Sequence, residues 1–175
     1  MPDVREQLRQ CFQGRVCLMG LGNEDYGDDG FGVRLVEELG TEGLGHVIIA
    51  GTEPERFIGQ VATQCFDHVI FLDAVEFGGA PGSVVLLGSD EMAARFPQVS
   101  THKLSLGLLA RQIEANRRTK AWLLGVQPES LKPGGALSAT VQATLKVLRA
   151  LLREVSLARR AEDCAAYPHS VEVVA

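Results

Sequence analysis

The alternation of apolar runs with amphipathic segments predicts an α/β fold, a three-layer α/β/α sandwich built around a mostly parallel sheet. Five apolar runs have the length of strands, at residues 15–20, 47–50, 69–72, 83–87 and 120–126. Segments with helical spacing separate most of them, and strands that alternate with helices form parallel sheets covered on both faces. The run at 69–72 is apolar at every position, so it is expected to be a central strand.

Three helices are predicted from residues that recur every three or four positions. The first spans about 29–39 and the second about 103–115, while the third begins after Ser138, a good N-cap. Their apolar faces are expected to carry, in order, Phe31, Leu35, Val36 and Leu39; Leu104, Leu108, Leu109 and Ile113; and Val141, Leu145, Leu148, Leu152 and Val155. Residues 55–65 have a weaker helical pattern. We expect one domain over residues 1–159 and a flexible tail over 160–175.

Composition and charge limit the function classes. With 46% hydrophobic and 22% charged residues, the 175-residue chain has the makeup of an ordinary soluble domain, long enough for a substantial core. Its net charge of -5 argues against binding to nucleic acid or to an anionic membrane. The four cysteines form no C-x-x-C pair, and no signal peptide or apolar stretch of transmembrane length is visible. These features predict a cytoplasmic protein.

A glycine-rich loop follows the first predicted strand, and two interpretations compete for it. The order strand, Gly20-x-Gly22, helix is typical of dinucleotide binding. However, the third glycine of that fingerprint would fall at Asp25, and three further carboxylates lie where a pyrophosphate would bind, namely Glu24, Asp28 and Asp29. A helix N-terminus favours one anion, which this chain already supplies. The nucleotide interpretation is therefore rejected.

Asp29 and Asp73 are the two aspartates that are candidates for catalysis or metal binding. Asp28 and Asp29 lie where capping residues are common, and capping is the simpler role for either of them. Asp29 is less easily dismissed, because Gly27 and Gly30 leave it uncrowded. Asp73 ends a wholly apolar strand, at the sheet edge where open α/β proteins bind ligands. Its alternative role is to form a turn, but the turn proper comes later, at Gly78 and Gly79.

His102 is the third candidate. If Ser100 or Thr101 capped the following helix, the histidine would simply be exposed. Two carboxylates and one imidazole from separate segments nevertheless resemble the open sites of catalytic transition metals. His46 and His68 flank strands, away from the sheet edge where the predicted site lies. The chain has no Gly-x-Ser-x-Gly or His-Glu-x-x-His motif, so no self-contained nucleophile or zinc site is evident.

Taken in order, these residues resemble a known family. The set comprises Gly20-x-Gly22-Asn23, Asp28-Asp29-Gly30-x-Gly32, Asp73-Ala74, Thr101-His102 and Gly125-Val126-Gln127-Pro128-Glu129. It is similar to the nickel–iron hydrogenase maturation endopeptidases, peptidase family M52, over about residues 15–152. The segments Gly51-Thr52-x-Pro54-Glu55 and 101–106 are most similar to the branch that serves formate-hydrogenlyase (hydrogenase 3) enzymes. Asp25 departs from the family, which usually has an apolar residue at that position.

The resemblance implies a phosphorylase/hydrolase-like α/β domain with an aspartic-type or metal-dependent endopeptidase activity. Such enzymes remove a C-terminal extension from the hydrogenase large-subunit precursor after nickel has been inserted. The positions that contact the metal are then Asp29, Asp73 and His102, which we take as catalytic and metal-binding residues. Gly22, Asn23, Asp28, Thr52 and Thr101 are expected to shape the site around them.

The cofactor and partner expectations follow from the same resemblance. The nickel is carried by the precursor, and the protease, expected to be a monomer, holds little or no metal of its own, because three ligands leave the coordination shell open. Nickel then either polarises the scissile carbonyl or activates water with an aspartate as base, or it is only recognised. Two alternatives stay open: a free-standing metallohydrolase, and a non-enzymatic chaperone that binds nickel or the precursor.

Overall fold

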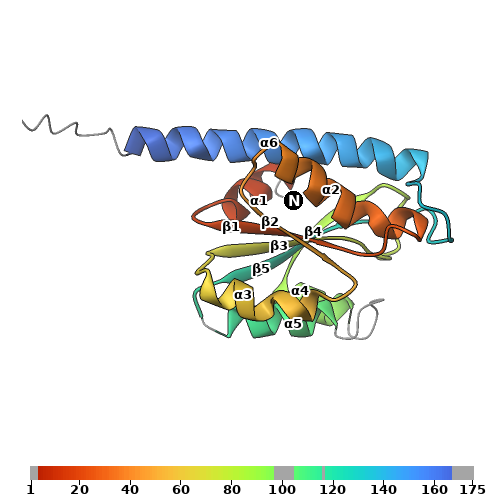
Figure 1. Cartoon of the computed structure of the whole chain (residues 1–175), viewed down its shortest axis with the longest axis horizontal. Coiled ribbons are helices and arrows are strands. Elements are labelled where there is room, and N and C mark those ends of the chain that lie inside the picture. The colour runs from red at the N-terminus through yellow and green to blue at the C-terminus, as the bar shows by residue number, and fades with distance from the viewer. Residues whose placement is uncertain (1–3, 97–104, 116, 167–175) are drawn as a thin grey trace, which may run out of the picture.

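Five strands form one sheet in the computed structural model of the chain, which describes residues 4–96, 105–115 and 117–166 (Figure 1). They are β1 (Val16–Leu21), β2 (His46–Gly51), β3 (His68–Ala74), β4 (Val84–Gly88) and β5 (Lys120–Val126). Their order is β2-β1-β3-β5-β4, and every neighbouring pair is parallel except β4 and β5. The predicted five-stranded, mostly parallel sheet and the central position of β3 are therefore confirmed.

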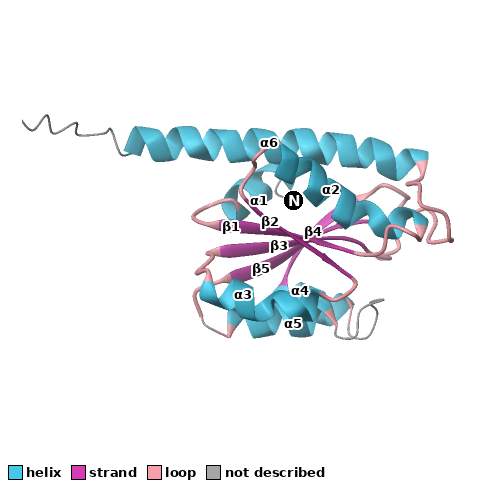
Figure 2. Cartoon of the chain, in the orientation of Figure 1, coloured by secondary structure: helices cyan, strands magenta, loops and turns pink. Residues whose placement is uncertain are grey.

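Helices cover both faces of the sheet, so the structure has three layers (Figure 2). One face carries α1 (Val4–Cys11), α2 (Phe31–Thr41) and α6 (Ala139–Ala166), and the other carries α3 (Ile58–Thr63), α4 (Ser89–Arg95) and α5 (Leu106–Glu114). Two 3-10 helices, η1 (Gly27–Gly30) and η2 (Pro54–Phe57), precede α2 and α3. None of the described helices is long and apolar enough to cross a membrane.

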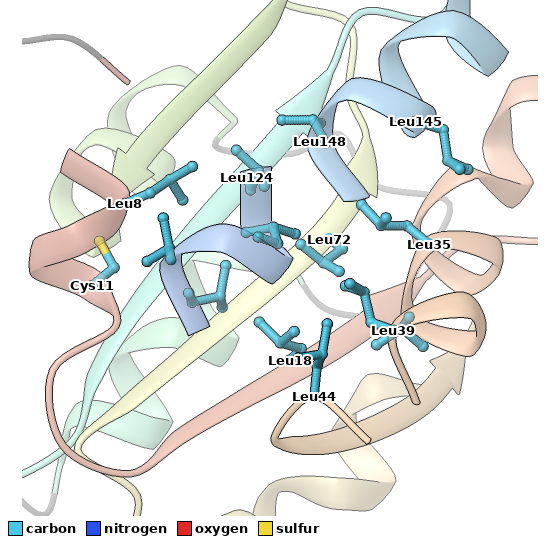
Figure 3. Close-up of a cluster of buried hydrophobic side chains, with 14 of the residues drawn as sticks. Leu8, Cys11, Leu18, Leu35, Leu39, Leu44, Leu72, Leu124, Leu145 and Leu148 are labelled. Atoms are coloured by element: carbon cyan, nitrogen blue, oxygen red, sulfur yellow. The ribbon is translucent and has the colours of Figure 1, made fainter. Parts of the chain in front are cut away.

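Each strand of the centre divides its side chains between two cores, because successive residues of a strand point to opposite faces. On β3, Ile70 and Leu72 pack under α2 and α6, whereas Val69 and Phe71 pack against the other helical layer. Figure 3 shows the first core, in which Leu18 and Leu124 from the sheet meet leucines of the helices. All five residues of the predicted α6 stripe, from Val141 to Val155, are buried there. This burial holds α6 against the sheet and fixes the strands relative to one another.

The antiparallel strand β4 follows from the length of its connection. Nine residues, 75–83, separate β3 from β4, whereas a parallel crossover needs a dozen or more. The chain therefore reverses direction and adds β4 at the sheet edge beside β5. The loop between β3 and β4 consequently stays at the carboxyl edge, where β1, β3 and β5 also end.

Several local expectations need correction. Helices α1 and α4 were not predicted, because each is short and mostly polar, with only Leu8 and Cys11 buried in α1 and Met92 in α4. Leu108, expected on the buried face of its helix, is 45% exposed, since α5 instead buries Leu106, Gly107, Leu109, Ala110 and Ile113.

The last helix runs on to Ala166, beyond the expected domain end at residue 159. Residues 103 and 104 of the predicted second helix lie outside the described residues, as do residues 167–175 of the predicted tail.

Candidate active site

The topology places a switch point between β1 and β3. From β1 the chain moves to β2 on one side of it and then returns to β3 on the other, so the connections after β1 and β3 diverge. In open α/β sheets, ligands bind at such a point, outside the carboxyl ends of the strands. The loop after β1 contains η1, which packs against β3, and β3 carries Asp73 near its end. The structure thus brings the segments of Asp29 and Asp73 together at this edge.

Asp29 is held in a tight backbone turn. Its side chain is only 5% exposed, and its Oδ2 accepts a hydrogen bond of 2.8 Å from the backbone N–H of Asn23. Gly22 has a φ of +110°, and a Cβ at this position would lie 1.8 Å from the carbonyl oxygen of Asp29. Only glycine fits such an approach. Gly22 and Asn23 therefore fix the position of the Asp29 carboxylate, which explains their part in the sequence motif.

Asp28 has a different role from the helix cap considered for it. It is fully buried, and its carboxylate accepts hydrogen bonds from the backbone N–H groups of Glu129, Ser130 and Ser138. The hydroxyl of Ser138, which is the N-cap predicted for α6, donates a fourth bond of 2.9 Å. Asp28 therefore ties the loop after β5 to the loop after β1, and its oxygens are occupied by these four donors.

Asp73 is 3% exposed and belongs to β3 itself. By the alternation of the strand, its side chain points to the same face as Phe71, the face covered by α3, α4 and α5. Because α5 runs back toward the start of β5, its first turn is directed toward the carboxyl edge. Asp73 therefore lies at the carboxyl edge, on the face of the sheet that α5 helps to cover.

Gln127 organises the loop after β3, a role that the sequence pattern did not predict. Its side-chain carbonyl accepts hydrogen bonds from three consecutive backbone N–H groups, those of Phe77, Gly78 and Gly79, at 2.9, 3.0 and 3.2 Å. The signal that pointed to it was its place in the segment from Gly125 to Glu129. Gln127 thereby fixes the turn that follows Asp73.

The loops after β1 and β5 form one wall of the site. Tyr26 and Gly134 form an isolated β-bridge, the N–H of Gly27 bonds the carbonyl of Gly134 at 3.0 Å, and the N–H of Asp28 bonds that of Ser130 at 3.0 Å. A cavity of about 210 Å³ opens beside this wall. It is lined by Asn23, Tyr26, Asp29, Thr52 and Leu131, so Thr52, an exposed residue after β2, also borders the site.

The imidazole of the predicted ligand set cannot be placed in the same way. His102 and Thr101 lie in residues 97–104, outside the described residues, and within the described ranges no group of three His, Cys, Asp or Glu side chains is arranged to hold a metal ion. The helix cap considered at Ser100 or Thr101 is instead Ser105, whose hydroxyl accepts from the N–H of Leu108 at 3.3 Å. The assignments of Asp29, Asp73 and His102 as catalytic and metal-contacting residues stay predictions.

None of the three cysteines whose side chains the structure describes, Cys11, Cys17 and Cys65, supplies a nucleophile at the switch point. Burial raises the pKa of both Cys11 and Cys17 to about 12, so these thiols stay protonated at neutral pH. Cys65 is exposed, but it precedes β3 and so lies at the opposite edge of the sheet. The carboxylates of Asp29 and Asp73 are therefore the strongest candidates for proton transfer at the switch point.

Open α/β proteins bind ligands at such a switch point, so the two buried carboxylates mark it as the candidate active site. The family model described as "HycI: Hydrogenase maturation protease" matches residues 33–154. The hydrogenase 2 maturation protease of Escherichia coli K12 is 34% identical over 152 residues, which cover 80% of this chain and 92% of that protein. The crystal structure of the maturation protease HycI from Thermococcus kodakarensis KOD1 superposes with a TM-score of 0.74 and 31% identity, over 86% of this chain and 99% of that one.

The chain belongs to the hydrogenase maturation protease family, and it is therefore a protease by descent. The resemblance noted from the sequence motifs and the α/β fold are both confirmed. The hydrogenase 3 maturation protease of E. coli K12 is also similar, with 30% identity over 114 residues, 64% of this chain and 72% of that protein. Relatives of both the hydrogenase 2 and hydrogenase 3 types thus match, and the predicted hydrogenase 3 subtype stays a prediction.

Proposed function

We propose that this protease removes the C-terminal extension of a [NiFe]-hydrogenase large-subunit precursor after nickel has been inserted, and that it inspects the nickel carried by its substrate. The observation that carries this proposal is the pair of buried carboxylates, Asp29 and Asp73, on segments that meet at the switch point. Two carboxylates that are both removed from water at the carboxyl edge of the sheet favour a bound cation. A metal ion presented by the precursor supplies that cation.

His102 completes the proposed set. It lies three residues before Ser105, the cap of α5, whose first turn is directed toward the carboxyl edge. A nitrogen ligand beside two carboxylates suits nickel, whose affinity for imidazole exceeds that of magnesium or calcium. Three protein ligands leave coordination positions for the groups of the precursor. We therefore propose that Asp29, Asp73 and His102 contact the substrate's nickel.

The proposed chemistry uses carboxylates for the proton transfers. Substrate-borne nickel supplies a Lewis acid near the scissile peptide bond. Either aspartate can take a proton from the attacking water and return it to the leaving amine. Asn23 and Gly22 hold Asp29 in place for this step, while Gln127 fixes the loop that follows Asp73. In this proposal the protease acts as a monomer in the cytoplasm, where the precursor is matured.

The experiment uses the purified full chain with nickel-loaded and nickel-free precursor, read by intact-mass spectrometry. The proposal expects loss of the C-terminal extension only from the loaded precursor. It expects far less than one tightly held metal ion per chain in the protease itself. Equal cleavage of both precursors, or a stoichiometric ion that survives chelation, would instead support a free-standing metallohydrolase. Binding of the precursor without any change in its mass would support a chaperone.

A further inference from the structure

Two exposed apolar side chains stand beside Asp29. Of the large hydrophobic residues in the described part of the chain, six are substantially exposed: Tyr26, Ile49, Leu108, Leu131, Val147 and Leu157. Tyr26 is 45% exposed and Leu131 is 38% exposed, and both line the cavity that also contains Asp29. Clustered exposed apolar groups rimmed by polar residues are typical of sites that bind a partner.

The wall that carries these two side chains is built by hydrogen bonds. Tyr26 pairs with Gly134 in a β-bridge, and Ser130, next to Leu131, accepts the N–H of Asp28. The Asp28 carboxylate in turn accepts the N–H of Ser130. The exposure of Tyr26 and Leu131 is therefore a fixed feature of two tied loops, and the binding surface is preorganised.

The size and lining of the cavity define what it accepts. Its volume of about 210 Å³ exceeds the roughly 150 Å³ of an engineered apolar cavity that binds benzene, so it has room for one large side chain. Its polar lining includes Asp29, whose Oδ2 accepts a hydrogen bond from the backbone N–H of Asn23. The exposed walls are the ring of Tyr26 and the side chain of Leu131. A negatively charged side chain would lose water against these walls and would lie beside the Asp29 carboxylate, whereas an apolar one would be favoured.

We infer that this cavity is the subsite for one large apolar side chain of the precursor beside the scissile bond, and that Tyr26 and Leu131 determine this specificity. The inference rests on the proposed function, since Asp29 belongs to both the cavity and the proposed nickel-contacting set. An apolar anchor next to Asp29 positions the peptide, so the two residues act on substrate selection and leave the chemical step to the carboxylates.

The test compares substrate selectivity in Leu131→Lys and in the wild type. Each of the four precursor residues on either side of the scissile bond is replaced in turn by Asp, and kcat/KM is measured on the nickel-loaded precursors. We expect one position at which Asp lowers the wild-type kcat/KM at least tenfold, mainly through KM. Leu131→Lys should recover most of that loss at the same position only, while it processes the unmodified precursor less well.

A matched control and a second variant complete the experiment. Val147→Lys places the same charge on α6, at a residue that is 66% exposed, and should keep the wild-type profile. Tyr26→Ala, with its melting temperature checked, should raise KM for the unmodified precursor severalfold with kcat nearly unchanged. If the wild type cleaves but Leu131→Lys shows the same profile, the subsite is wrong while the proposed function stands. If the wild type cleaves no precursor at all, both are wrong.

Discussion

β3 has an aspartate close to each of its ends, and the two differ in how far they are exposed to water. Asp67, just before the strand, accepts the backbone N–H of Arg15 at 2.7 Å and pairs with Arg118 at 3.5 Å, and its side chain is 34% exposed. The N–H of Arg15 is the main reason that the pKa of Asp67 is lowered. Asp73, near the other end, is buried within a strand of apolar residues.

We interpret Asp67 as a structural carboxylate, in contrast to Asp73, for which a functional role is proposed. Asp67 closes the turns at the starts of β1, β3 and β5, where its backbone also bonds Arg15 and Lys120. Asp73 lies with Asp29 at the carboxyl edge, where burial of charge lowers stability unless a partner compensates. Buried ionisable groups at the carboxyl edge of an open α/β sheet are candidates for a functional site.

The largest effect is expected at the proposed nickel-contacting residues. Asp29→Ala, Asp73→Ala and His102→Ala should each lower the processing of nickel-loaded precursor by at least about 100-fold, because a ligand or proton-transfer group is lost. None of the three residues belongs to an apolar stripe, so each variant should remain folded by circular dichroism. Processing at the wild-type rate by any of these variants would remove that residue from the site.

Asp28 should behave as a stability residue, in contrast to its neighbour Asp29. Asp28→Asn removes charged acceptors from four donors, which we expect to lower the free energy of unfolding by about 3 kcal/mol. Ser138→Ala removes one of these donors and the α6 cap, and should cost about 1 kcal/mol. Urea unfolding measures both. An Asp28→Asn variant as stable as the wild type would show that the charge of Asp28 adds nothing to these four hydrogen bonds.

His68 and Asp67 lie at the amino edge of the sheet, where β1, β3 and β5 begin, and they should control the pH dependence of stability. Burial lowers the pKa of His68, whose Nδ1 accepts a 3.0 Å hydrogen bond from Trp122 Nε1. The pKa of His68 in the folded protein lies below its unfolded value of about 6.5. The buried neutral imidazole therefore contributes its full stability above about pH 6.5, and this contribution is lost as the pH falls through the folded pKa. Asp67, also lowered, contributes above about pH 4 and is lost at lower pH.

Urea unfolding at a series of pH values checks this expectation. The wild type should lose stability first below about pH 6.5 and again below about pH 4. His68→Gln should lack the first decrease, and Asp67→Asn should lack the second. If both variants follow the wild-type curve, the amino edge does not account for the acid sensitivity.

The smallest effect is expected at the C-terminus. The apolar stripe of α6 ends at Val155, which is 3% exposed, so the core closes before residue 160. A chain truncated after Arg160 should melt within a few degrees of the full chain and process the precursor normally. A truncated protein that folds normally but cleaves poorly would instead indicate that Val171–Val174 helps to bind the precursor, for example by adding to a sheet edge.

The strands could be predicted closely because burial on both faces leaves a continuous apolar signal. The apolar run at 69–72 lies inside β3, and residues 120–126 coincide with β5. The stripe from Val141 to Val155 likewise fixed the face of α6. Short helices such as α1 and α4 bury only one or two apolar side chains each, so periodicity is too weak to reveal them.

The site was harder to predict, because its organising contacts are distant in sequence. Asp28 bonds Ser138 across 110 positions, and Gln127 bonds Phe77 across 50, and no local pattern contains such pairs. Gly22 could be read as a loop glycine, but its contact with the Asp29 carbonyl is visible only in three dimensions. Local spacing could therefore identify the carboxylates, but it could not show that Asp28 ties two loops together while Asp29 borders the cavity.

The most direct test of the contrast along β3 uses two matched substitutions in one assay. Asp73→Asn and Asp67→Asn each remove one negative charge with little change in size, at opposite ends of the same strand. Initial rates of C-terminal processing are measured with nickel-loaded precursor by intact-mass spectrometry. Asp73→Asn should be slower than the wild type by at least about 100-fold, whereas Asp67→Asn should stay within about twofold. Equal rates for the two variants would contradict the assignment of function to the carboxyl edge.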